Sequence, residues 1–324
     1  MGFDNKKWLA GAGIVTAGLA AVGAVSHAVT RELVSIAVDR DYPRNITERA
    51  RRQFTGSKEN EAFMQHMEQM AQRLETADTR TVTITASDGE KLVGHWYSCK
   101  NAKRVVIAMH GWRSSWSLGF GMIADFLHSS GCSVLYAEQR GQGNSGGAYM
   151  GLGALERHDC LAWINWVLES GCQLPIYLAG VSMGATTVLM ATGLGLPENV
   201  RGIVADCGFT SPEDIGRHVV SNNLHLSYRL RAGAADSMCR TRNKVGIRGC
   251  SAVDALKENS VPVLFIHGAD DRLVPVTMTY ENYAACAGPK ELLIIPGADH
   301  GMSYYVDKKR YEAALKSFWE RYDT

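Results

Sequence analysis

Short apolar runs recur along the middle and the C-terminal part of the chain, and most of them are separated by amphipathic stretches. The runs are rich in Val, Ile and Leu and cover residues 104–110, 132–138, 175–181, 201–207, 262–268 and 291–297. Strands that are buried on both faces of a parallel sheet have this continuous apolar character. The stretches between them, such as 154–170 and 305–322, have the pattern of helices. This alternation predicts an α/β fold, a mostly parallel twisted sheet with helices on both faces.

Two segments before the first of these runs have other periods. Residues 81–87 and 91–98 alternate between apolar and polar positions around Asp88 and Gly89, which predicts an antiparallel hairpin at one edge of the sheet. Residues 47–76 are polar and helix-permissive. Their apolar residues recur at helical spacing and form one stripe: Phe63, Met67, Met70 and Leu74.

The region between residues 209 and 254 interrupts the strand and helix alternation. It has no apolar strand run but contains several polar helical pieces. An insertion after the carboxyl end of a strand lies over the ligand-binding edge of an open sheet, so residues 211–253 are predicted to form a small helical cap. We expect Leu226 and Tyr228 to line the substrate-binding surface. The cap arginines Arg229, Arg231 and Arg240 are expected to face solvent.

The N-terminal segment 8–30 contains no Asp, Glu, Lys or Arg and follows Lys6 and Lys7. About 20 helical residues are enough to cross a bilayer. The segment therefore favours a membrane anchor. Lysines beside a span tend to stay on the cytoplasmic side, so Lys6 and Lys7 would leave the catalytic domain outside the cytoplasm. A cleaved signal peptide, giving a secreted protein, and an ordinary helix of a cytoplasmic protein are the alternatives.

Composition and charge narrow the class of protein. The 324 residues are 46% hydrophobic, which is sufficient for a large core, and 34 Lys and Arg balance 33 Asp and Glu to a net charge of +1. The balance argues against a nucleic-acid partner. The predicted organisation is an anchor or signal peptide at 1–30, a helical lead-in at 31–78, and a main domain at 79–210 and 254–324 that carries the cap.

The eight cysteines stand singly, and no C-x-x-C pair suggests a metal centre. Most lie in apolar runs, where a free cysteine packs as a small hydrophobe. Cys239 and Cys250, which flank a polar segment, are the candidates for a disulfide. We expect neither a metal nor an organic cofactor.

The motif that carries chemistry is Gly-Val-Ser-Met-Gly at residues 180–184. It follows an apolar strand and opens a helical stretch, which is the context of a nucleophile elbow. Such a turn lifts the hydroxyl of Ser182 clear of the sheet. A serine hydroxyl needs a base to take its proton and a carboxylate to orient that base.

Both partners follow later strands of the same predicted sheet. His300 comes after the run at 291–297, and Asp271 comes after the run at 262–268. The carboxyl ends of parallel strands meet at one edge, so Ser182, Asp271 and His300 are expected to lie together. Their order along the chain is that of the α/β hydrolases. Asp270 and Asp206 are the alternative carboxylates.

From about Thr81 to Tyr322 the chain resembles the serine α/β hydrolases, in particular the esterase and serine-aminopeptidase-like branch. The resemblance is carried in order by five motifs: His110-Gly111, Arg140 to Ser145, Gly180 to Gly184, His267 to Pro275, and Asp299-His300. Glu138 departs from the family pattern, which has Asp before the Arg-Gly turn. The N–H of Met183, the residue after the nucleophile, is one expected oxyanion donor. The resemblance implies Trp112 as the other.

These residues predict a serine hydrolase that cleaves small-molecule carboxylic esters with short to medium acyl chains. A thioesterase, a lipase-like enzyme or a peptidase would use the same triad. A non-catalytic binding protein on the same fold is the alternative from another class, because fold alone does not establish activity. The sequence does not indicate the oligomeric state.

Overall fold

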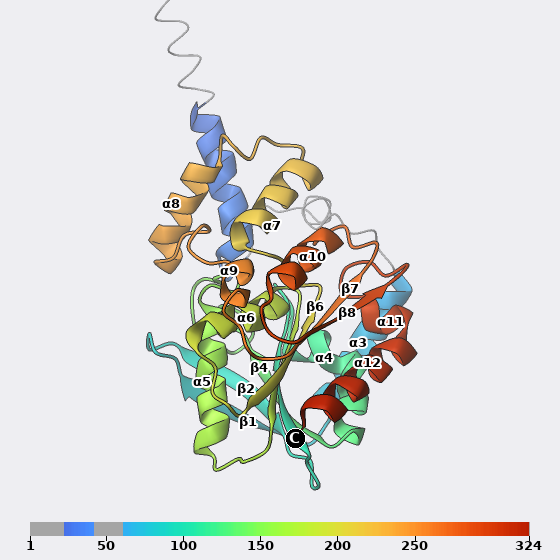
Figure 1. Cartoon of the computed structure of the whole chain (residues 1–324). Coiled ribbons are helices and arrows are strands. Elements are labelled where there is room, and N and C mark those ends of the chain that lie inside the picture. The colour runs from blue at the N-terminus through green and yellow to red at the C-terminus, as the bar shows by residue number, and fades with distance from the viewer. Residues whose placement is uncertain (1–22, 42–60, 324) are drawn as a thin grey trace, which may run out of the picture.

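The computed structural model describes residues 23–41 and 61–323, and its centre is one eight-stranded sheet (Figure 1). The strand order is β1-β2-β4-β3-β5-β6-β7-β8. The strands are β1 (Thr79–Thr85), β2 (Lys91–Tyr97), β3 (Arg104–Met109), β4 (Cys132–Glu138), β5 (Ile176–Val181), β6 (Val200–Asp206), β7 (Val263–Gly268) and β8 (Lys290–Ile295).

The pairing of the strands confirms the predicted sheet. β1 and β2 form an antiparallel hairpin in which Thr85 pairs with Lys91, and β2 runs antiparallel to β4. All the other neighbours are parallel. In the parallel strands β3, β4 and β7 every residue is buried, which explains their continuous apolar sequences.

Helices cover both faces of the sheet and bury a separate apolar cluster on each. α4 and α12 pack on one face, while α5, α6 and α9 pack on the other. The helices are α3 (Glu61–Glu75), α4 (Trp116–Ser129), α5 (Glu156–Glu169), α6 (Met183–Ala191), α7 (Pro212–His218), α8 (Ala232–Asn243), α9 (Ala252–Leu256), α10 (Val276–Ala285), α11 (Ser303–Val306) and α12 (Lys308–Tyr322). The predicted stripe of residues 63–74 lies on α3, which packs against α4.

The segment after β6 carries α7, a π-helical turn η2 (Val219–Asn223) and α8, and these lie at one end of the sheet (Figure 1). A helix at residues 23–38 lies beside α8. Val34 and Val38 of this helix pack with Cys239 of α8 in one buried cluster. The extreme N-terminal residues 1–22, and with them most of the predicted anchor, lie outside the described residues. Within the described ranges, no helix has the length and apolar character needed to cross a membrane.

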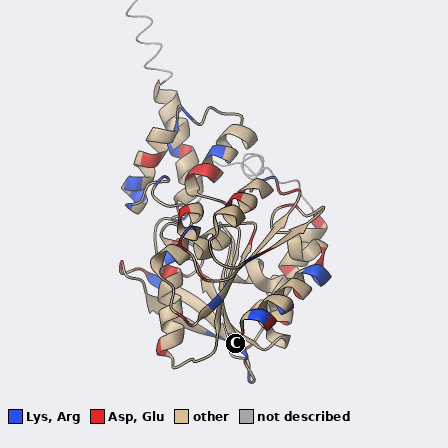
Figure 2. Cartoon of the chain, in the orientation of Figure 1, with Lys and Arg blue, Asp and Glu red and all other residues tan. Residues whose placement is uncertain are grey.

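Cys239 and Cys250, the candidates for a disulfide, do not form one. Both thiols are free. Cys239 packs against the N-terminal helix, whereas Cys250 belongs to the large cluster under α5 and α6. The two residues flank the same polar segment but are buried against different partners. Figure 2 shows basic and acidic residues interspersed over the helices in this view, in keeping with the balanced charge.

Candidate active site

Ser182 stands at the sharp turn between β5 and α6, as the motif predicts. Its backbone has φ +56° and ψ −119°, a conformation that is sparsely populated for a non-glycine residue and costs roughly 1–3 kcal/mol. The positions of Gly180 and Gly184 have no room for a side chain. A Cβ on Gly184 would overlap the carbonyl oxygen of Met109, and one on Gly180 would overlap that of Gly184.

The structure brings the three predicted residues together. His300 Nε2 lies 2.9 Å from Ser182 Oγ, and His300 Nδ1 lies 2.7 Å from Asp271 Oδ2. The side chain of Asp271 is fully buried and that of His300 is 17% exposed, so the imidazole is the more accessible of the two. This arrangement can pass a proton from the hydroxyl to the imidazole.

Asp271 is held by four groups. Its Oδ1 accepts hydrogen bonds from the backbone N–H groups of Leu273 and Val274, and its Oδ2 lies 3.2 Å from Nε2 of the buried His267. Burial disfavours the charged carboxylate, but His300 and His267 outweigh burial and hold the pKa of Asp271 below its ordinary value. The carboxylate is therefore ionised and fixed in orientation.

The alternative carboxylates lie elsewhere. Asp270 is exposed. Asp206 is buried, accepts a hydrogen bond from Ser303 Oγ, and has its pKa raised by burial to about 6. The neighbouring Asp299 accepts hydrogen bonds from the backbone N–H groups of His300 and Arg272, so it shapes the loop that carries the histidine.

Cys207 is a neighbour of the triad that the sequence does not single out. The donor atoms of Cys207, Asp271 and His300 lie within 4.8 Å of one another, which makes them a candidate metal-binding group among the described residues. Burial raises the pKa of the Cys207 thiol. Asp271 and His300 are already hydrogen-bonded to each other, so the atoms that a metal would need are in use. We therefore keep the prediction that no metal binds here.

The loop after β3 passes beside the nucleophile. A Cβ on Gly111 would lie 3.4 Å from Ser182 Cβ, so this loop and the start of α6 flank the same hydroxyl. His110 is buried, its Nε2 accepts a hydrogen bond from the backbone N–H of Gln139, and burial lowers its pKa to about 4. His110 is thus a neutral support of the loop, while Trp112 and Met183 share one apolar cluster beside Ser182.

Comparison with known proteins places this geometry in a family. The family model of the prolyl oligopeptidase family matches residues 118–323, which include all three residues of the triad. The chain belongs to the prolyl oligopeptidase family. Membership and the α/β-hydrolase fold together identify a hydrolase.

Relatives and solved structures agree with this assignment. An uncharacterized protein, YqkD of Bacillus subtilis, is 26% identical over 75% of this chain and 80% of its own length. A non-heme haloperoxidase of Rhodococcus erythropolis is 26% identical over 73% of this chain and 98% of its own length. The Pyrococcus furiosus esterase Pf2001 superposes with a TM-score of 0.62 at 24% identity, covering 78% of this chain and 94% of the esterase. The resemblance to serine α/β hydrolases is confirmed.

This member of the prolyl oligopeptidase family attaches its N-terminal helix to the loop beside the nucleophile. Trp112 Nε1 donates a hydrogen bond of 2.8 Å to the carbonyl oxygen of Ala37. The guanidinium of Arg113 donates to the carbonyl oxygens of Ile36, Asp39 and Arg40 at 2.6–3.1 Å. The carbonyls of Ile36 and Ala37 belong to the last turn of the helix, where such groups have no partner within the helix itself, and those of Asp39 and Arg40 follow directly after it. The sequence of the N-terminal segment did not predict this contact.

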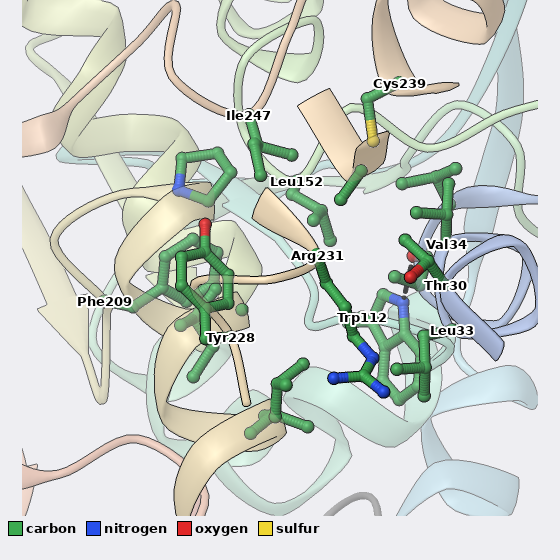
Figure 3. A pocket seen from close by; sticks show the side chains of 18 of the residues that line it. Thr30, Leu33, Val34, Trp112, Leu152, Phe209, Tyr228, Arg231, Cys239 and Ile247 are labelled. Carbon is green, nitrogen blue, oxygen red and sulfur yellow. Dashed lines mark hydrogen bonds between the residues drawn. The ribbon is translucent and has the colours of Figure 1, made fainter. Parts of the chain in front are cut away.

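A cavity of about 130 Å³ opens beside Ser182 between the N-terminal helix and the cap. Figure 3 shows Leu33 and Val34 on one side and Phe209 and Tyr228 on the other. Tyr228 lines the cavity as expected. Leu226, two residues away, does not line it.

Arg231 is half-buried and lines the cavity with part of its side chain, whereas Arg229 is exposed and Arg240 pairs with Asp236. Its Nη1 donates to the carbonyl oxygen of Ser227 on the exposed side, so solvent exposure of its guanidinium stays a prediction. Arg231 immediately precedes α8, which packs against the N-terminal helix.

Glu138, the departure from the family pattern, organises the loop that follows β4. Its carboxylate lies 2.7 Å from His95 Nε2 and accepts hydrogen bonds from the side chain and backbone N–H of Asn144, while its carbonyl accepts one from Ser145 Oγ. It is a buried structural carboxylate away from the triad.

Proposed function

We propose that this protein is a serine carboxylic-ester hydrolase that cleaves small-molecule esters with short to medium acyl chains. The observation that carries the proposal is the pair of contacts from His300, 2.9 Å to Ser182 Oγ and 2.7 Å to Asp271 Oδ2, beside an apolar cavity. Apart from Arg231, the described residues that line this cavity are uncharged.

The reaction follows from these contacts. With its own proton on Nδ1 and directed at Asp271, His300 takes the proton of Ser182 as Oγ attacks the ester carbonyl. The backbone N–H groups of Met183 and Trp112 would stabilise the oxyanion. His300 then protonates the leaving alcohol, and water releases the acid by the reverse sequence.

The cavity supports an ester over an aminopeptidase substrate. A volume of about 130 Å³ compares with roughly 150 Å³ for an engineered cavity that holds benzene, so it suits a short to medium apolar group. None of the described residues that line it is acidic, so a protonated amino terminus would find no ion-pair partner there. A peptidase remains the second candidate because of the family to which the chain belongs.

A substrate panel tests the proposal. The full chain is assayed with p-nitrophenyl esters of increasing acyl length and, in parallel, with aminoacyl anilides. We expect hydrolysis of the esters, with a maximum in kcat/KM at short to medium length. Faster cleavage of the anilides would favour the peptidase. Failure to hydrolyse either series, together with no labelling by a fluorophosphonate, would favour the binding protein.

The pH dependence of kcat/KM should report His300. Burial disfavours the charged imidazole, but the attraction of Asp271 outweighs it and holds the pKa of His300 above its ordinary value of 6.5. Only the neutral imidazole can accept the serine proton, so activity should be lost as pH falls through this raised pKa. We expect a midpoint above 6.5 in a profile of p-nitrophenyl acetate hydrolysis. A profile that is flat or has its midpoint below this value would contradict the assignment.

The N-terminal helix should contribute to catalysis as well as to the location of the protein, because it holds the loop beside Ser182. Deleting residues 1–22 removes none of the described contacts and should preserve kcat. Deleting residues 1–41 removes the carbonyls that hold Trp112 and Arg113, together with one cavity wall, and should lower kcat for p-nitrophenyl acetate by about 100-fold, as misplacement of a catalytic group does.

Two measurements separate this effect from unfolding. Far-UV circular dichroism and Tm show whether the longer deletion still folds. Substitution of Trp112 by Phe, which removes the indole N–H that binds Ala37 and keeps an aromatic ring of smaller size, should give a smaller fall of the same kind in the full chain. Unchanged kcat in a folded 1–41 deletion would contradict a role for the helix.

A further inference from the structure

The cavity beside Ser182 has an apolar wall on almost every side and one cation. Leu33 and Val34 of the N-terminal helix face Phe209, Ile215 and Tyr228 across it. Arg231 is the only Lys, Arg, Asp or Glu among the described residues that line it. Figure 3 shows this side chain extending from the cap into the space between the two walls.

Arg231 lacks the carboxylate partner that its neighbours have. Other arginines of the cap lie 2.8–3.3 Å from a carboxylate oxygen: Arg217 from Asp214, Arg240 from Asp236, Arg242 from Asp39, and Arg248 from Glu213. In the described part of the chain, Arg231 Nη1 donates to the carbonyl oxygen of Ser227 at 2.8 Å, and its buried Nε has no hydrogen-bond partner. Among the described residues, Arg231 therefore brings a positive charge without a carboxylate partner to the edge of the cavity, where its contact with Ser227 lies on the exposed side.

A guanidinium at the edge of an apolar cavity gains from an anion that lies beside it. A hydrogen bond between two charged groups is stronger than one between neutral groups. The planar fork of Arg matches the two oxygens of a carboxylate. One arginine balances one negative charge, whereas a phosphate monoester would bring nearly two.

We propose that the cavity binds an ester whose apolar body ends in a carboxylate, with the carboxylate held by Arg231 and the ester carbonyl at Ser182. The substrate class is thus the monoesters of aliphatic dicarboxylic acids. This inference rests on the proposed function. Each turnover consumes one water: the bond from Ser182 Oγ to the acyl carbon forms as the alcohol leaves with a proton, and water then releases the dicarboxylic acid.

A matched pair of substrates tests the inference. Mono-p-nitrophenyl adipate carries the distal carboxylate, and its methyl ester is of similar length and shape but neutral. We expect the wild-type chain to prefer the anionic ester in kcat/KM, mainly through KM. The ratio of the two kcat/KM values should fall about 10- to 100-fold in Arg231→Gln, the range typical of a hydrogen bond to a charged group. Arg231→Lys, which keeps the charge without the fork, should retain part of the preference.

Arg229→Gln is the control, because Arg229 is exposed two residues before Arg231 and does not line the cavity. It should leave the ratio unchanged. Equal rates with the two esters in the wild type, or the same ratio in wild type and Arg231→Gln, would overturn the inference.

A binding measurement keeps this result separate from the fate of the proposed function. Calorimetric titration of Ser182→Ala protein with hexanoate requires no catalysis. Hexanoate should bind, hexanamide should bind more weakly, and adding Arg231→Gln should weaken hexanoate binding by about 10-fold or more. If neither ester is hydrolysed while hexanoate binds through Arg231, the proposed function fails and the anion site stands. If the neutral ester is hydrolysed and Arg231→Gln changes neither the ratio of the two esters nor the binding of hexanoate, the proposed function stands and the anion site fails.

Discussion

Replacing Ser182 with alanine is expected to lower kcat for p-nitrophenyl acetate by about 10⁴- to 10⁶-fold. The variant loses the hydroxyl that lies 2.9 Å from His300 Nε2. Without the hydroxyl the acyl-enzyme cannot form. Steady-state hydrolysis measures the loss, and labelling by a fluorophosphonate should disappear with it.

The substitution should leave the fold intact, because one small side chain at the surface of the turn is removed. Tm and far-UV circular dichroism should match the wild type. Ser170→Ala, at an exposed serine just after α5, is the matched control and should keep full activity. Substantial residual hydrolysis by a folded Ser182→Ala protein would place the nucleophile elsewhere.

Substitution of Asp271 by Asn should lower kcat by about 10⁴-fold. Asn can still accept the backbone hydrogen bonds of Leu273 and Val274, so the turn should persist. It no longer favours the imidazole tautomer that carries its proton on Nδ1, and it removes the charge that stabilises the imidazolium. Steady-state kinetics measure the loss, and the pH midpoint should move downward because the pKa of His300 loses the influence of Asp271.

Asp270→Asn is the internal control, one residue away. Asp270 is exposed, whereas Asp271 is buried against His300 and His267. The Asp270→Asn variant should therefore retain nearly full kcat and the wild-type pH midpoint. A ranking in which Asp270→Asn is the more damaging change would overturn the assignment of the orienting carboxylate.

The sheet could be predicted because its signal is local. In β3, β4 and β7 every residue is buried, so most positions are apolar or small, and the hairpin of β1 and β2 alternates around its own turn. The boundaries shift by only one or two residues, as the ends of strands have weaker constraints than their centres.

The positions of Ser182, Asp271 and His300 could also be predicted, because each follows the carboxyl end of a strand in one parallel sheet. The residues that contact Asp271 and His300 from adjacent strands could not be predicted. His267 contacts Asp271 from within β7, and Cys207 reaches the histidine from the end of β6. Both contacts depend on how adjacent strands are aligned, and a run of apolar residues does not specify that alignment.

The cavity is where prediction failed most. Small apolar residues in the N-terminal helix suit a bilayer or a protein surface equally well, and nothing in the sequence near Ala37 indicates that Trp112 and Arg113 bind its end. The contribution of Arg231 to the same cavity, likewise, depends on α8 packing beside a helix that is more than 190 residues away along the chain.

The sequence by itself determined the strands, the hairpin, the elbow and the order of the triad, because these depend on side-chain periodicity and on turns of a few residues. Only the tertiary structure decided that residues 23–38 form a wall of the cavity, that Cys239 and Cys250 stay apart, and that Arg231 lines the cavity while Leu226 does not. The physical reason is that burial is a property of pairs of surfaces. A pattern along the chain shows that a face will be covered, but which distant segment covers it is settled when the elements pack.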